Sequence, residues 1–259
     1  MAKQIYNYEL FTNKKDELAK IRKKAARNRR IKILLLALIL AGTAIVAYIL
    51  FNSNYYTYKD KVDTEDSGDV SYENFDEGYL KYSSNGIEYQ KQFGRAEWNI
   101  ALSYEHPFLA KSDSYAVLGD KGENTLILLN KNGKVREFTL KYPLLQATVS
   151  EQGIIQMILE GSDSNYVQVY GKNGKLIADM RSSIEEKGYP ITAAISPNGT
   201  QLAVSYYSIN GNTSKTSIAF YDLSRQLQSD SIPLKGGFDY TNTIIPKVSF
   251  MDDNTVAAF

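Results

Sequence analysis

Few residues in this chain are of the types that carry out catalysis. The sequence has one His, His106, and no Cys. A nucleophilic triad needs a His as its base, and His106 precedes Pro107 in what we expect to be a connection into a strand, so we assign it a solvent-facing or capping role. Zinc and copper sites built from His and Cys are excluded by count. We therefore expect no metal, no cofactor and no enzymatic activity.

Carboxylate pairs are the remaining catalytic chemistry, because glycosidases place two of them around one glycosidic bond. Four carboxylates stand at the ends of expected strands: Asp120, Glu160, Asp163 and Asp222. Asp and Glu in such places usually form turns, and we interpret all four in this way. A carboxylate-dependent glycoside hydrolase stays open as an alternative function.

The chain contains 20 Tyr, and tyrosine rings can stack on sugars. Four of them lie on neighbouring expected strands and form our candidate ligand surface: Tyr166, Tyr170, Tyr206 and Tyr221. Successive side chains of a strand face opposite sides of its sheet, so Tyr207, next to Tyr206, belongs to another surface. Packing between strands is the simpler interpretation of these rings.

The elements that position these residues begin with an apolar stretch. Residues 33–51 contain no charged side chain, and as a helix at about 1.5 Å per residue they cover about 28 Å, close to the ~30 Å hydrocarbon core of a bilayer. The apolar part of a secretory signal is shorter, about 7 to 15 residues. We predict an uncleaved transmembrane helix from Ile33 to Phe51, which makes the lipid bilayer a partner of the chain.

The charges on either side of this helix set its orientation. Residues 1–32 contain eleven Lys and Arg against three Asp and Glu, whereas the remaining residues carry a net charge of −7. Basic segments stay on the cytoplasmic side of a membrane. We therefore predict a cytoplasmic arm at 1–32, helical from Asn13 to Arg30, and an extracytoplasmic C-terminal domain. The negative charge of that domain disfavours nucleic acid as a partner.

An acidic segment follows the helix. Between Asp60 and Glu77 there are eight Asp and Glu against Lys61 alone, and a stretch of like charges repels itself and stays extended. The alternating pattern of a calcium-binding loop is missing. We predict an extended linker at 52–78.

Residues 79–259 are expected to form an all-β domain, because short runs of β-branched and aromatic residues are separated by Asn-Gly and Asp turns. The clearest expected strands are residues 115–119, 125–130, 154–159, 166–170, 202–207 and 217–221. The turn Lys-Asn-Gly-Lys occurs at 131–134 and again at 172–175. Two other turns end in Gly153 and Gly199. Intervals in the forties between equivalent turns indicate four-stranded repeats with the spacing of β-propeller blades.

The stretch at 191–223 resembles a known fold. AISPNGTQLAVSYY followed by SIAFYDL resembles the blade pattern of WD40-like and quinoprotein-like propellers, although the Gly-His and Trp-Asp pairs of true WD40 repeats are absent. The order of basic arm, anchor and propeller-like domain is similar to that of an uncharacterised family of membrane-anchored proteins in clostridia and their relatives. The resemblance implies a β-propeller fold and brings no activity or catalytic residues with it.

Three four-stranded units are recognisable, at 107–140, 144–180 and 191–234, whereas closed propellers have about four to eight blades. Strands at 79–90 and 247–259 would combine into a fourth, composite blade. Alternatively the ring is incomplete, because the sequence ends inside an apolar strand, and we favour this second interpretation.

We therefore predict a single-pass protein of a bacterial cell envelope with its N-terminus in the cytoplasm. Its outer domain is expected to act as a non-enzymatic scaffold that binds an envelope protein or a cell-wall glycan. Two alternatives remain: an extracytoplasmic glycoside hydrolase, and a membrane signalling protein that works through its basic cytoplasmic arm.

Overall fold

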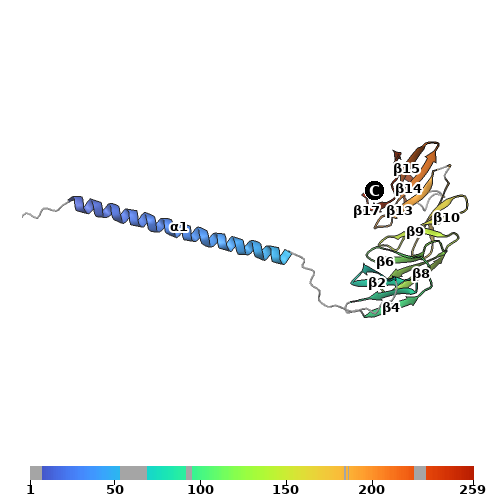
Figure 1. Ribbon diagram of the computed structural model, residues 1–259, viewed down its shortest axis with the longest axis horizontal. Helices are drawn as coiled ribbons and strands as arrows, with labels where there is room; N and C mark the ends of the chain where they lie inside the picture. Colours follow the sequence, from blue (N-terminus) through green and yellow to red (C-terminus); the bar gives the residue numbers. More distant parts are fainter. Residues whose placement is uncertain (1–7, 53–68, 92–94, 184, 186, 225–231) are drawn as a thin grey trace, which may run out of the picture. The chain divides into compact units, whose positions relative to one another are not determined.

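A computed structural model describes residues 8–52, 69–91, 95–183, 185, 187–224 and 232–259. The chain divides into two compact units, Met1–Lys61 and Val62–Phe259. The first unit contains the only helix among the described residues, and the second contains all the described strands (Figure 1).

The helix, α1 (Tyr8–Asn52), is continuous. From Glu17 to Tyr48 its residues are exposed, and this part is long and apolar enough to cross a membrane; a signal sequence near the N-terminus meets the same criterion. We predicted a basic helix from Asn13 to Arg30 and a transmembrane helix from Ile33 to Phe51. The two form a single helix because no Pro or Gly interrupts the residues that join them.

The second unit consists of successive antiparallel sheets, and each sheet is formed by strands that are consecutive in the sequence. The first sheet contains β1 (Ser71–Phe75), β2 (Gly78–Ser83), β3 (Gly86–Gln90) and β4 (Ala96–Ala101). The second contains β5 (Pro107–Lys111), β6 (Tyr115–Asp120), β7 (Thr125–Asn130) and β8 (Gly133–Thr139). The third contains β9 (Leu144–Val149), β10 (Ile155–Glu160), β11 (Asn165–Tyr170) and β12 (Leu176–Ser182).

The fourth sheet contains β13 (Tyr189–Ile195), β14 (Gln201–Asn210), β15 (Thr213–Asp222) and β16 (Leu234–Thr241). Strands β17 (Val248–Phe250) and β18 (Val256–Ala258) pair only with each other among the described residues. The six expected strands and the two Lys-Asn-Gly-Lys hairpins are confirmed, and the fold class is β-propeller-like.

At the ends of the domain the structure differs from the alternative that we did not favour and from one predicted boundary. The composite fourth blade does not form, because β2 and β3 pair with β1 and β4 rather than with β17 and β18. The expected linker at 52–78 also overlaps β1, where Phe75 is buried against the first sheet. We did not predict this strand, because Glu73 and Asp76 belong to the acidic segment that we assigned to the linker.

Apolar cores fill the spaces between successive sheets. Leu80 and Tyr89 of the first sheet pack on Leu118 of the second, and three similar clusters join the later sheets. The second, third and fourth sheets are therefore covered on both faces. Their central strands are continuous buried runs, such as residues 116–120 of β6 and 155–159 of β10, as expected for strands without a solvent-facing side.

Hydrogen bonds between turns add to these cores. The first strands of successive sheets lie next to one another, and the turns that follow them are joined from sheet to sheet. These bonds run from Ser112 Oγ to Ser150 O (3.1 Å), from Glu151 N to Pro197 O (3.0 Å) and from Asn198 N to Asp253 Oδ1 (2.9 Å). These turns thus fix the second, third and fourth sheets and the β17–β18 hairpin to one another.

Candidate binding site on the first sheet

The single histidine, His106, and one carboxylate candidate, Asp120, meet where the chain enters β5. Asp120 is buried at the end of β6, and its two carboxylate oxygens accept hydrogen bonds from the backbone N–H groups of Glu105 (2.9 Å) and His106 (2.6 Å). The His106 side chain is exposed. Because backbone donors occupy both of its oxygens, Asp120 orders the chain that enters β5, which is the turn-forming role expected from the sequence.

The other carboxylate candidates lie elsewhere. Glu160 ends β10 and Asp163 follows it, and both are exposed. Asp222 ends β15, where its Oδ1 accepts a hydrogen bond from Ser224 N at 3.0 Å. Because β15 is antiparallel to the second strands of the sheets, Asp222 lies at the opposite end of the sheets from Glu160. The structure does not gather these carboxylates into one site, and the described residues contain no cluster of three or more His, Asp or Glu that could hold a metal ion.

Two tyrosines of the predicted ligand surface are core residues. Tyr206 of β14 and Tyr221 of β15 are 3% and 4% exposed, and their hydroxyl groups lie 3.3 Å apart in a hydrogen bond. They pack between the third and fourth sheets, where burial is the main cause that raises the pKa of Tyr206. The surface prediction is wrong for these two residues, because alternation along a strand does not reveal that both faces of the sheet are covered.

The other two tyrosines, Tyr166 and Tyr170 of β11, pack against the core between the second and third sheets. Tyr166 stacks on Tyr142 with a centroid separation of 4.5 Å and an angle of 8° between the rings. Lys141 Nζ lies 5.1 Å from the centroid of the Tyr142 ring. The four predicted tyrosines therefore lie in two different spaces between sheets and do not form one surface.

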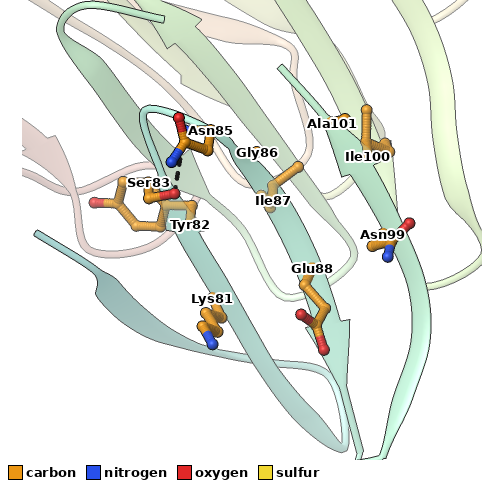
Figure 2. A pocket seen from close by; sticks show the side chains of 10 residues that line it. All are labelled: Lys81, Tyr82, Ser83, Asn85, Gly86, Ile87, Glu88, Asn99, Ile100 and Ala101. Carbon is orange, nitrogen blue, oxygen red and sulfur yellow. Dashed lines mark hydrogen bonds between the residues drawn. The ribbon is translucent and has the colours of Figure 1, made fainter. Parts of the chain in front are cut away.

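The outward face of the first sheet carries polar side chains in rows across its strands. Leu80 of β2 and Ile87 of β3 point toward the second sheet. The residues that follow them on the same strands therefore point away from it. Lys81 of β2 stands opposite Glu88 of β3, and Glu88 stands opposite Asn99 of β4. Figure 2 shows these three side chains side by side on their strands. We call Lys81, Glu88 and Asn99 the polar row.

A hollow of about 270 Å³ lies at the polar row. Two residues along each strand from the polar row, on the same face, a second row consists of Ser83, Gly86 and Ala101. Gly86 and Ala101 have no side chain beyond Cβ. Gly86 cannot be replaced by a larger residue without movement, because a Cβ there would lie 2.4 Å from Ile100 O. Small residues thus create the depression beside the polar row (Figure 2).

Two tyrosines flank the polar row on the side of β1. Tyr72 stands opposite Lys81 and is 44% exposed, with its ring centroid 5.8 Å from that of Tyr79. The Tyr79 hydroxyl donates to Gln90 Oε1, and Gln90 Nε2 donates to Glu88 Oε1 at 2.5 Å. This chain of hydrogen bonds orients the Glu88 carboxylate within the polar row.

The arrangement is suited to binding a polar ligand. Lys81 and the Asn99 amide are donors, Glu88 is an acceptor, and the Tyr72 ring offers an apolar face for stacking. Hydroxyl and amide groups of a ligand can therefore meet donors and acceptors across three strands. The residues that line the hollow include no His and no Cys, so they do not form a nucleophile with an imidazole base.

The sequence does contain a pattern that indicates this exposed face, but we searched for tyrosines rather than for that pattern. Polar residues alternate with apolar ones in β2 to β4, as Lys81 does with Leu80 and Asn99 with Trp98, whereas β6 and β10 are mainly apolar and show no such alternation. An antiparallel sheet that alternates has one face toward solvent. Comparing the strands for alternation would have located the polar row.

Comparison with known proteins gives a family and a fold. A family of unknown function, DUF5711, matches residues 51–259. No curated protein matches the sequence.

Similar solved structures include a complex of KlAtg21 with the coiled-coil of AgAtg16, with 13% identity, a TM-score of 0.54 and coverage of 71% of this chain and 61% of that one. The WD40 domain of Neurospora crassa Pan2 has 12% identity and a TM-score of 0.47, covering 73% of this chain and 57% of that one. Kuenenia stuttgartiensis hydrazine synthase has 11% identity and a TM-score of 0.47, covering 74% and 54%. The chain thus spans less than two thirds of the length of these proteins, and likeness at such identities concerns the fold alone.

Proposed function

The chain belongs to the DUF5711 family of unknown function, and on this premise we propose that it is a membrane-anchored, non-enzymatic scaffold that binds a glycan of the cell envelope. In this proposal residues 33–51 cross the bilayer and residues 1–32 lie in the cytoplasm. The propeller-like domain lies outside, and the outward face of its first sheet holds the ligand.

The observation that carries the proposal is the polar row beside its hollow. Every other face of the first three sheets is buried in a core between sheets, whereas this face remains open and combines a cation, a carboxylate and an amide in register. Sugars present closely spaced hydroxyl groups and apolar ring faces. The polar row can bond the hydroxyl groups while the exposed Tyr72 ring stacks on a sugar ring.

The anchor and the scaffold support each other physically. A domain tied to a membrane by a short segment stays in a thin layer above it, so even a weak site meets a local ligand at high effective concentration. The first sheet is fixed to the second by their shared core and by the hydrogen bond from Trp98 Nε1 to Lys131 O, and turn-to-turn bonds join the later sheets. A rigid domain loses little conformational entropy on binding.

The hydrolase alternative receives less support, because Asp120 is occupied by two backbone donors and Asp222 lies at the far end of the sheets from Glu160. The signalling alternative depends on contacts of the basic arm with a cytoplasmic partner, and no contact of the described residues favours it.

The test uses the full chain in lipid nanodiscs and purified peptidoglycan fragments as the probe. Glu88→Gln removes the acceptor charge of the polar row, and Glu160→Gln removes the same charge from the exposed end of β10 as a matched control. We expect Glu88→Gln to weaken binding about tenfold, which corresponds to ~1.4 kcal/mol for one charge-assisted hydrogen bond, and Glu160→Gln to leave it unchanged.

Two results would contradict the proposal. Equal binding by both variants would mean that the polar row does not contact the glycan. Release of new reducing ends from the fragments, lost in Glu160→Gln, would indicate the hydrolase instead.

A further inference from the structure

One structural position recurs in the fourth strand of the first three sheets. At this position the strand has just passed a shift in register, and the residue faces the next sheet. The pairs are Trp98 opposite Tyr89, Arg136 opposite Leu128 and Ala178 opposite Val169. Trp98, Arg136 and Ala178 are therefore structural equivalents.

In the first two sheets this side chain reaches across the groove to the next sheet. Trp98 Nε1 donates to Lys131 O at 3.0 Å, and Arg136 Nε donates to Lys172 O at 3.3 Å. Both acceptors are in the turn between the third and fourth strands of the following sheet. Ala178 offers neither the length nor the donor to make the corresponding contact.

A second side chain that borders these grooves also differs in size from one sheet to the next. Tyr115 O accepts a hydrogen bond from Ser112 N (2.8 Å), and Ile154 O accepts the equivalent bond from Ser150 N (2.9 Å). The ring of Tyr115 occupies the groove between the second and third sheets, with Lys172 Nζ 5.6 Å from its centroid. In the next groove the shorter Ile154 stands at this place.

These two smaller side chains leave the groove between the third and fourth sheets hollow. A cavity of about 530 Å³ lies there. Ile154, Ile177 and the buried Leu223 give it apolar walls, while the exposed Lys172 and Lys175 stand at its rim. Leu223 lies two residues after the register shift at Tyr221 in β15, just as Lys172 lies two residues after the shift at Tyr170 in β11. The backbone carbonyl of Leu223 is therefore equivalent to that of Lys172, which accepts the hydrogen bond from Arg136.

We propose that this hollow binds an aromatic side chain, of the size and donor chemistry of Trp, presented by a segment of a partner protein. The chain itself shows the fit, because Trp98 reaches across the equivalent groove and donates to the equivalent turn. The Lys172 ammonium is directed at Tyr115, to whose hydroxyl it donates at 3.3 Å, so Lys175 is the cation at the rim. Lys175 selects between the two native occupants, because it repels a guanidinium and attracts the electron-rich face of a ring. The described residues that line the hollow include no Asp or Glu that would attract a guanidinium.

This protein-binding hollow is independent of the proposed glycan site on the first sheet. Two residues of its lining, Gln152 and Ile154, belong to the turn that is joined to the next sheet through Glu151 N and Pro197 O. Aromatic anchors in pockets of this kind commonly dominate the binding energy of protein interfaces.

The experiment uses the full chain in nanodiscs with labelled Ile methyl groups and N-acetyl-L-tryptophanamide as the probe. We expect saturable millimolar binding with shifts of the Ile154 and Ile177 resonances. N-acetyl-L-argininamide, which carries the other native side chain, should bind at least fivefold more weakly. Ile177→Trp fills the hollow and should weaken binding at least tenfold, whereas Ile209→Trp, at the exposed end of β14, should not change it.

Lys175→Ala provides a second variant at an exposed turn, where folding is not at stake. It should weaken binding of the tryptophan probe two- to threefold. Shifts confined to other residues, equal binding of the two probes, or unchanged binding by Ile177→Trp would each overturn the proposal.

Discussion

Glu88 and Asn99 stand directly opposite one another on β3 and β4, on the one face of the first sheet that no other described sheet covers. Their partners on the inner face, Ile87 and Ile100, belong to the core shared with the second sheet. The same strands thus provide a core on one side and a polar row on the other. This division gives the propeller-like domain an open face whose groups are held by the sheet itself.

Replacing Asp120 should destabilise the propeller-like domain. Asp120→Ala removes the acceptor of the part-buried N–H groups of Glu105 and His106, and each lost hydrogen bond should cost about 0.5 to 1.5 kcal/mol. Asp120→Asn keeps one carbonyl acceptor and should cost less. Urea unfolding followed by the fluorescence of the single Trp, Trp98, reports on this domain. The exposed Asp163→Ala is the control, and an equal loss in both Ala variants would mean that Asp120 has no capping role.

Gly153→Ala should be more costly than Gly122→Ala. Both glycines have positive φ, 76° and 90°, but a Cβ at Gly153 would lie 3.1 Å from Tyr115 and 3.2 Å from Lys172, whereas nothing lies within 4 Å at Gly122. We expect about 1 kcal/mol of backbone strain at either position and a further loss from crowding at Gly153 alone. Equal destabilisation of the two variants would show that the close approach between sheets is not required.

The buried tyrosine pair predicts a loss of stability at high pH. Burial raises the pKa of Tyr206 above the value of about 10 that tyrosine has in an unfolded chain. Its contribution is fully present below pH ~10 and is lost as the pH rises further, because the unfolded chain releases this proton first. Tyr206→Phe should be less stable than the parent at pH 7, where Tyr221 loses its partner, and this difference should shrink above pH 10. A constant difference in the free energy of unfolding across this range would contradict the burial of an un-ionised Tyr206.

The helix should determine membrane association. Arg at the centre of a crossing helix costs about 2.5 to 3.5 kcal/mol on insertion scales, so Leu38→Arg combined with Ala41→Arg should move the chain out of the carbonate-resistant membrane fraction. Leu38→Ala, which keeps the segment apolar, should leave it there. Membrane association that survives both arginines would show that residues 33–51 are not the anchor.

Most of the fold could be predicted from the sequence because local signals specify it. Repeated Lys-Asn-Gly-Lys turns and apolar runs marked the strands of the second, third and fourth sheets, including β7 and β11. The first sheet was harder, because β1 lies within an acidic run whose charges resemble those of a linker. The pairing of β17 with β18 rather than with the first sheet depends on contacts between distant residues, which strand patterns do not specify.

The candidate site could not be predicted by choosing residue types. Tyr206 and Tyr221 have the right chemistry for a ligand surface, but they are placed in a core by the sheets on either side. The polar row consists of ordinary residues, Lys81, Glu88 and Asn99, whose significance comes from their register across three strands. Register and the coverage of faces are tertiary properties, and alternation along β2 to β4 was the only local trace of them.

The most direct test of the central claim is the acetylation rate of individual lysines in the full chain, measured with and without saturating peptidoglycan fragments. If the glycan binds at the polar row, it should slow acetylation of Lys81 several-fold, while Lys121, in the turn after β6, should react as before. Saturable glycan binding with an unchanged rate at Lys81 would contradict the assignment of the site to the first sheet.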